Sequence, residues 1–166
     1  MENKVVLVTD IQSAFARHTQ FLGLSVRDIR EPATKDEQWE AIYWEQASMT
    51  DFVERNRIIS HLLKAPKGCI RILDFNIRNI GTTEEQTIDK SLEYCDLLKI
   101  GKQEMLMLCN LFGIATKSIF DCSFEIMAHF DIKTLILNHG NRGCHVFHGT
   151  YFPMPAGISV RHDLLS

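Results

Sequence analysis

The chain has 166 residues, of which 45% are hydrophobic and 23% are charged. This composition is typical of a globular protein and excludes a disordered or fibrous one. The net charge is −3, and the 18 Lys and Arg residues are scattered among 21 Asp and Glu residues without a basic stripe, so we expect no nucleic-acid partner. No apolar run reaches the roughly 18 residues of a membrane span, and residues 1–3 lack the basic flank of a signal peptide. We therefore expect a cytoplasmic protein without a membrane partner, folded as a single α/β domain over residues 1–166.

The five cysteines are odd in number, widely spaced and set mostly in apolar surroundings. They are Cys69, Cys95, Cys109, Cys122 and Cys144. In a cytoplasmic protein this pattern predicts reduced thiols that are buried as small hydrophobic side chains.

The first 35 residues carry weaker patterns than the rest of the chain. Residues 4–9 are a short β-branched run, which predicts a strand buried on both faces. Residues 11–22 predict a helix with Ile11, Phe15, His18 and Leu22 on one face, ended by Gly23. Residues 25–30 alternate weakly and predict a short strand.

From residue 35 onward, helical and strand patterns alternate. Helices are predicted at 51–64, from 83 onward, at 102–112 and at 118–130, and strands at 69–74, 96–100 and 132–137. Alternation from about residue 41 indicates βαβ units, and therefore a Rossmann-like, mostly parallel sheet with helices on its faces. Residues 144–147, 150–154 and 158–160 are short apolar segments separated by Gly and Pro, which predicts a β-meander at the edge of the sheet.

Polar side chains follow the strand predicted at 69–74. Asp74, Asn76 and Arg78 occupy alternate positions, so an extended chain would point them the same way. A carboxylate, an amide and a guanidinium at the carboxyl end of a strand indicate a polyol or phosphate site. The alternative is a strand that runs into a solvated loop.

Two further strand ends carry polar groups. Lys99 ends its strand and Glu104 lies in the first turn of the next helix, where a carboxylate either holds a magnesium-bound water or caps the helix. Asn138, Gly140 and Gly143 belong to a loop whose glycines let the backbone approach a ligand closely, although many such loops are only turns.

A cluster of His139, Cys144, His145 and His148 has the residue types of a zinc site. Alternation along a strand puts Cys144 and His148 on one face and His145 on the other, so we expect no metal site there. A nucleophilic pair of Cys144 and His148 lacks an orienting third group. Neither a P-loop nor a Gly-x-Gly-x-x-Gly turn occurs in the sequence.

Taken in order, the three strand ends resemble the ribokinase/fructokinase-type carbohydrate kinases, the phosphofructokinase-B type. Residues 74–78 match the Asp-x-Asn-x-Arg element of this family, and residues 99–104 and 138–143 resemble its Lys-x-Asn-x-x-Glu and Thr-x-Gly-x-x-Gly elements. Gly101 and Asn138 stand where the family has Asn and Thr. The resemblance covers residues 36–163, and residues 1–35 can match only the region near the family's lid. It implies a ribokinase-like fold. It also implies a transferase that, with Mg²⁺, moves a phosphoryl group from ATP to a sugar hydroxyl.

The resemblance also implies roles for the strand-end residues. The expected nucleotide-binding residues are Lys99, Glu104, Asn138, Gly140 and Gly143, and the expected sugar- and phosphate-positioning residues are Asp74, Asn76 and Arg78. The family's sugar-binding segment would precede residue 1, and its Gly-Ala-Gly-Asp motif, which carries the anion hole and the catalytic aspartate, would follow residue 163. We therefore expect a partial or degenerate kinase that is inactive alone, holds no catalytic residue, and exposes apolar surface suited to homo-oligomer formation. The alternative is a non-catalytic α/β module that binds a nucleotide, a metabolite or a protein partner.

Overall fold

A computed structural model describes residues 3–33, 37–77, 85–115 and 118–149. Strands of these residues form one sheet in the order β2-β1-β3-β4-β5-β6-β7. The first six strands pair in parallel, and β7 is antiparallel to β6. The strands are β1 (Asn3–Val8), β2 (Ser25–Asp28), β3 (Glu37–Glu45), β4 (Ile70–Phe75), β5 (Leu97–Gly101), β6 (Thr134–Asn138) and β7 (Cys144–His148). The predicted mostly parallel sheet is confirmed, and β1 and β2 join the same sheet as the later strands.

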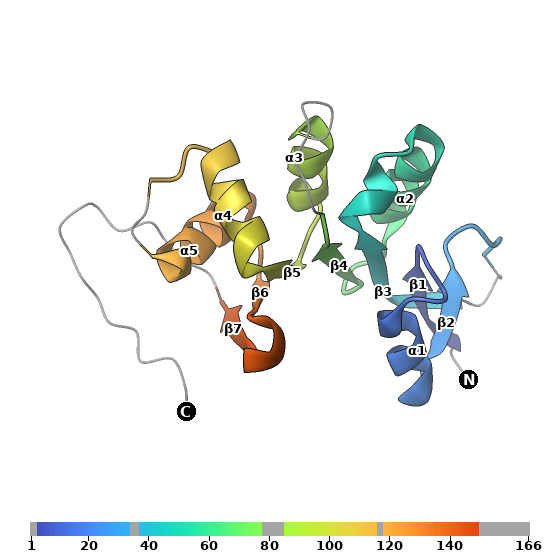
Figure 1. Ribbon diagram of the computed structural model, residues 1–166. Coiled ribbons are helices and arrows are strands. Elements are labelled where there is room, and N and C mark those ends of the chain that lie inside the picture. The colour runs from blue at the N-terminus through green and yellow to red at the C-terminus, as the bar shows by residue number, and fades with distance from the viewer. Residues whose placement is uncertain (1–2, 34–36, 78–84, 116–117, 150–166) are drawn as a thin grey trace.

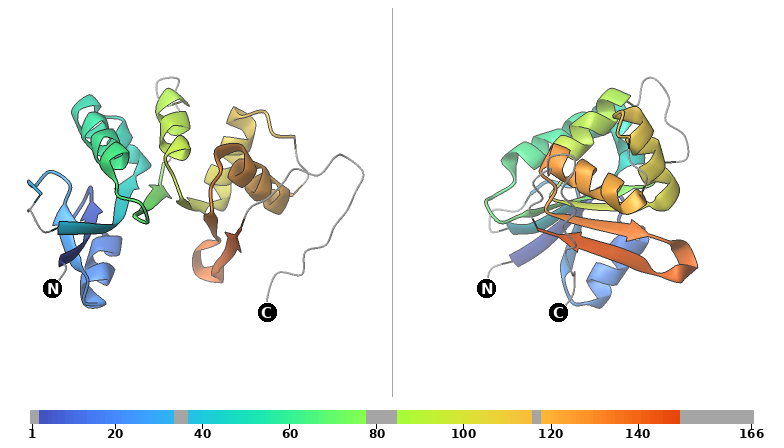
Figure 2. Two further views of the ribbon diagram at one scale, coloured as in Figure 1. Left: turned by 180° about the vertical axis from the view of Figure 1, so that it is seen from behind. Right: turned by 90° about the vertical axis from the view of Figure 1, so that its left-hand side faces the viewer.

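The helices lie on both sides of the sheet but are unevenly distributed between the two sides. They are α1 (Ala14–Phe21), α2 (Phe52–Lys64), α3 (Glu85–Glu93), α4 (Lys102–Leu111) and α5 (Ile119–Phe130), with short 3-10 turns η1 (Gln46–Met49) and η2 (Gly140–Arg142). Figure 1 shows α2 to α5 on one side of the sheet and α1 on the other. Figure 2 shows the same division with the sheet viewed along its edge. None of these helices is long and apolar enough to cross a membrane.

Two apolar cores follow from this arrangement. The larger core lies between the sheet and α2 to α5 and contains fully buried Trp44, Leu73 and Phe75. The smaller core lies under α1 and contains Val8 and Tyr43. Because neighbouring residues of a strand point to opposite faces, β4 sends Leu73 and Phe75 to the large core and leaves Asp74 on the side of α1.

The side of the sheet that carries α1 is only partly covered. The α1 core takes its fully buried strand residues from β1 and β3. Ile70 on β4 is 49% exposed and Val146 on β7 is 56% exposed. Parallel sheets are usually buried on both faces, so these two side chains mark the part of this face that the described residues leave uncovered.

Most predicted elements are present, and the face predicted for the first helix is half right. Asp51 caps α2 by accepting a hydrogen bond from Glu54 N at 2.8 Å. The first helix begins at Ala14 rather than residue 11, because Ser13 caps it by accepting from Ala16 N at 3.1 Å. Ile11 and Phe15 pack on the smaller core as predicted, whereas His18 is exposed and Leu22 is 70% exposed, so the second half of the predicted face is wrong. The first strand of the predicted meander is β7, while residues 150–154 and 158–160 lie outside the described residues.

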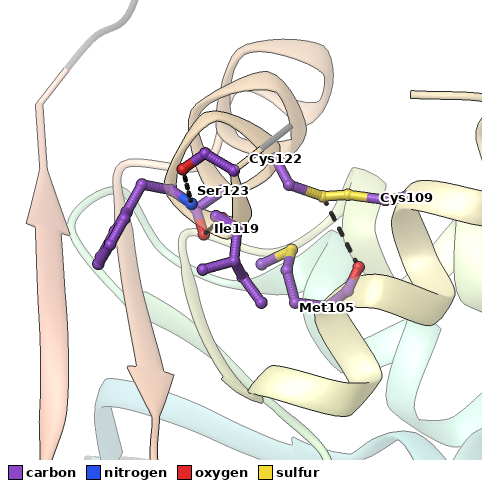
Figure 3. Close-up of a disulfide and its surroundings, with 7 residues drawn as sticks. Met105, Cys109, Ile119, Cys122 and Ser123 are labelled. Atoms are coloured by element: carbon purple, nitrogen blue, oxygen red, sulfur yellow. Dashed lines mark hydrogen bonds between the residues drawn. A yellow bond between two sulfur atoms is a disulfide. The ribbon is translucent and has the colours of Figure 1, made fainter. Parts of the chain in front are cut away.

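The cysteine prediction is wrong for three of the five residues. Cys109 and Cys122 form a disulfide that joins α4 to α5, with Cα atoms 6.3 Å apart (Figure 3). Beside it, Cys122 Sγ lies 3.8 Å from Met105 O. Cys144 is exposed, whereas Cys69 and Cys95 are buried free thiols, as predicted. Sequence spacing does not show which buried cysteines the packing of two helices brings together.

Candidate functional site

A cavity of about 640 Å³ opens at the carboxyl edge of the sheet. It is lined by Asn76, Ile77, Gly101, Lys102, Gln103, Glu104, Met107, Asn138, His139, Gly140 and Arg142. These residues end or follow β4, β5 and β6, so each of the three predicted strand-end elements contributes to the lining, through Asn76, Glu104, and Asn138 with Gly140. Ligands of open α/β sheets bind outside this edge.

Glu104 connects two walls of the cavity. Its Oε2 accepts a hydrogen bond from Gly101 N at 2.7 Å and its Oε1 accepts one from Ile77 N at 3.0 Å. Burial raises the pKa of Glu104, and these two hydrogen bonds oppose the shift without cancelling it. Of the two roles considered for this carboxylate, the structure shows helix capping. A Cβ at Gly101 would lie 3.0 Å from Oε2, so glycine makes room for the cap.

The turn between β6 and β7 forms the opposite wall. Asn138 Oδ1 accepts a hydrogen bond from Gly140 N at 2.9 Å, and His139 N donates to Gly143 O at 2.8 Å. Gly140 has φ of 66° and Gly143 has φ of 91°, values that favour glycine. Asn138 and Gly140 line the cavity, whereas Gly143 closes the turn and does not line it.

The cavity has two cationic side chains that the sequence interpretation missed, Lys102 and Arg142. Lys102 begins α4, so its charge lies beside first-turn N–H groups that lack partners within the helix. Arg142 projects from the turn after β6. The sequence signal that could have identified them is their position inside the predicted strand-end elements, residues 99–104 for Lys102 and residues 138–143 for Arg142. Together they make the cavity suited to an anion.

Asp74 lies apart from the cavity. Its Oδ2 accepts hydrogen bonds from Tyr43 Oη at 2.8 Å and from Lys99 Nζ at 2.6 Å, on the side of α1. The strand ends at Phe75, and Asn76 N donates to Asp74 O at 3.0 Å in a tight turn. The turn ends the alternation, so Asn76 lines the cavity while Asp74 and Lys99 do not. Arg78 lies outside the described residues.

Asp74 belongs to a second polar group that crosses three strands. The register places Glu45 beside Asp74 and Asp74 beside Lys99. Burial raises the pKa of Glu45, and the neighbouring charge of Asp74 raises it further. Burial also raises the pKa of Tyr43, whose ring stacks on Phe15 at a centroid distance of 4.0 Å. Within this group, Asp74 is thus hydrogen-bonded to Tyr43 and ion-paired with Lys99.

The four residues weighed as a zinc cluster separate into different contacts. His139 Nε2 lies 2.8 Å from His145 Nδ1, and His148 Nδ1 lies 2.8 Å from Thr134 Oγ1. Cys144 pairs across the sheet with Asn138. Within the described ranges, no three His, Cys, Asp or Glu side chains gather as a metal site.

Comparisons with known proteins give matches among solved structures alone. No protein-family model matches the sequence, and no curated protein matches it. A fructokinase from Vibrio cholerae O395 with bound fructose, ADP and potassium ion superposes with a TM-score of 0.58 at 14% identity, over 94% of this chain and 62% of that one. An ATP-bound fructokinase from Xylella fastidiosa has a TM-score of 0.56 at 14% identity, over 86% and 58%.

Aminoimidazole riboside kinase from Salmonella enterica, complexed with aminoimidazole riboside and an ATP analogue, has a TM-score of 0.51 at 18% identity, over 90% of this chain and 62% of that one. The chain therefore spans 58% to 62% of the lengths of these three kinases. At these identities the matches show the fold. The chain has the ribokinase-like α/β fold of these sugar kinases over the part of their length that it spans.

Proposed function

We propose that the carboxyl-edge cavity binds the phosphate groups of an adenine nucleotide, in a chain that is a partial or degenerate member of the sugar kinase family. The observation that carries this proposal is the meeting of three strand-end elements at one cavity that also holds Lys102 and Arg142. The ATP bound in the fructokinase from Xylella fastidiosa supports the choice of nucleotide.

Each wall of the cavity offers a contact of the kind that phosphate prefers. Lys102 supplies a point charge, and the Arg142 guanidinium can bind two phosphate oxygens at once. The first turn of α4 adds backbone N–H groups and the positive end of the helix dipole. Because both Glu104 oxygens accept backbone N–H bonds, we expect Mg²⁺ to be held chiefly by the nucleotide phosphates and water.

The same geometry argues against phosphoryl transfer by this chain alone. Among the described residues that line the cavity, Glu104 is the one carboxylate, and its oxygens cap α4. No carboxylate of the described lining is thus free to act as a general base for a sugar hydroxyl, and His139, the other lining group able to take a proton, has its Nε2 2.8 Å from His145 Nδ1. The loss of a general base costs about 10²- to 10⁴-fold in rate. The proposed activity is therefore nucleotide binding without turnover. It combines the two interpretations of the sequence, a partial or degenerate kinase and a non-catalytic module that binds a nucleotide.

Calorimetric titration of the purified chain with Mg·ATP and Mg·ADP tests the proposal. Lys102→Ala and Arg142→Ala should each weaken binding about tenfold, which corresponds to about 1.4 kcal/mol. Lys99→Ala is the matched control, because this lysine contacts Asp74 outside the cavity and should leave binding unchanged. Absence of nucleotide binding by the wild-type chain would refute the proposal. Equal weakening by Lys99→Ala would instead favour the nucleotide role first predicted for Lys99.

A separate assay tests the catalytic part. ADP release from Mg·ATP in the presence of fructose or a riboside should stay at the rate measured without sugar. Sugar-dependent turnover would contradict the inference that the cavity offers no free carboxylate as general base, while leaving the nucleotide site intact.

A further inference from the structure

We propose that His139 and His145 form a two-histidine site for a divalent first-row transition metal ion, at the rim of the carboxyl-edge cavity. The two facing nitrogens are His139 Nε2 and His145 Nδ1, 2.8 Å apart. The ring planes are inclined by 81° with centroids 4.8 Å apart. This inference rests on the histidine pair and is independent of nucleotide binding.

The separation of the two nitrogens fits shared coordination. Metal–imidazole bonds of about 2.0–2.1 Å that meet at a right angle place their nitrogens about 2.9 Å apart, whereas a tetrahedral angle places them about 3.3 Å apart. The observed 2.8 Å lies next to the right-angle value. This separation is that of the hydrogen bond between the rings and does not distinguish the two geometries, so the choice of ion rests on affinity for imidazole, which is higher for Ni²⁺ and Cu²⁺ than for Mn²⁺ or Fe²⁺.

The backbone and a neighbouring ring hold both histidines in place. His139 N donates to Gly143 O at 2.8 Å, which closes the turn between the two residues. His145 lies on β7 opposite Leu137 and has the ring of Phe120 edge-on at 5.0 Å. The backbone of each histidine is thus fixed, and coordination of one ion at a right angle requires each lone pair to lie about 45° from the line between the two nitrogens, so both rings rotate out of their hydrogen bond when the ion binds.

The protonation state of the pair also suits a metal. A hydrogen bond between two imidazoles needs an acceptor nitrogen, so at least one ring is neutral. On binding, the ring whose facing nitrogen carries the proton changes to its other tautomer, so two neutral rings bind the ion without net proton release. Lys102 and Arg142 line the same cavity and their charges disfavour every divalent ion alike, so the test uses an ion with high affinity for imidazole.

Titration of the untagged wild-type chain with Ni²⁺ at neutral pH, followed by calorimetry, tests the site. We expect one Ni²⁺ per chain and loss of this binding in both His139→Ala and His145→Ala. His148→Ala is the matched control, because it changes another exposed histidine of the same strand, and it should bind as the wild type does. Cys144→Ser should also bind normally, and Mg²⁺, which prefers oxygen ligands, should not compete.

NMR of the wild-type chain provides a readout that needs no variant to fold. The ring protons of His139 and His145 should respond to Ni²⁺ before those of the other histidines. Absence of Ni²⁺ binding by the wild type, retained binding in either single variant, or loss of binding in His148→Ala or Cys144→Ser would each overturn the proposal.

Discussion

Replacement of Glu104 tests whether one carboxylate holds the cavity walls together. Glu104→Ala removes the acceptor for Gly101 N at 2.7 Å and for Ile77 N at 3.0 Å. A hydrogen bond to a charged group contributes about 1.5–3 kcal/mol, and a carboxylate in the first turn of a helix adds about 0.3–1 kcal/mol. Because Glu104 is only half-buried, water can satisfy part of what is lost. We therefore expect the free energy of unfolding to fall by about 2–4 kcal/mol.

Urea unfolding at neutral pH measures this loss, and amide hydrogen exchange locates it. Exchange at Gly101 and Ile77 should accelerate more in Glu104→Ala than exchange elsewhere in the sheet. Gln103→Ala is the matched control, because it changes an exposed neighbour in the same turn and should alter stability by less than about 0.5 kcal/mol. If Glu104→Ala unfolds within that margin of wild type and exchange is unchanged, the cap does not join β4 to α4.

The pH dependence of this residue has a definite sign. Burial raises the pKa of Glu104 above its ordinary value of 4.5, so the folded chain binds the proton more tightly than the unfolded chain does. The proton-linked part of its contribution to stability is therefore fully present below pH 4.5 and is lost as the pH rises through the raised pKa, whereas the two backbone hydrogen bonds that the carboxylate accepts persist at neutral pH. Glu104→Gln should remove this part of the slope of unfolding free energy against pH. An unchanged slope would show that another group causes it.

Three further predictions concern interactions away from the cavity. Glu37→Gln should lower the unfolding free energy by about 3–5 kcal/mol in urea, because it breaks a buried ion pair with Arg27 whose side chains are 9% and 2% exposed; a loss below about 1 kcal/mol would contradict this. Reduction of the disulfide between Cys109 and Cys122, 13 residues apart, should cost about 3 kcal/mol by the chain-entropy relation, and an unchanged thermal midpoint after reduction would refute it. Burial alone would raise the pKa of Asp96, but the hydrogen bonds and the charge of Arg71 lower this pKa below 3.8. Stability should therefore fall in acid as the pH drops through the lowered pKa. Asp96→Asn should flatten this fall, measured by circular dichroism.

The sequence predicted those parts of the fold that local patterns determine. The start of α4 after Gly101 follows from an apolar helical pattern and a first-turn carboxylate, and the helices predicted to begin at residues 51 and 118 begin one residue later, after the caps Asp51 and Ser118. The meeting of the strand ends also followed, because parallel strands place their carboxyl ends at the same edge. These inferences needed only residue order and spacing.

Features set by contacts between distant residues were not predictable. The neighbours of Asp74 depend on strand register, which puts Lys99 directly beside it and turns both away from the cavity. The disulfide depends on how α4 packs on α5, and the pairing of His139 with His145 depends on the turn between them. Alternation along an isolated strand correctly separates His145 from Cys144 but does not show that the preceding loop supplies a second histidine.

The central claim is that phosphate groups of a nucleotide bind at the carboxyl-edge cavity. Amide NMR spectra of the ¹⁵N-labelled chain, recorded during titration with Mg·ADP, test it most directly. We expect saturable shifts at the amides of Lys102, Gln103 and Gly140, with little change in β1 and β2 at the far end of the sheet. Saturable shifts confined to other regions, or spectra unchanged by Mg·ADP, would contradict the claim.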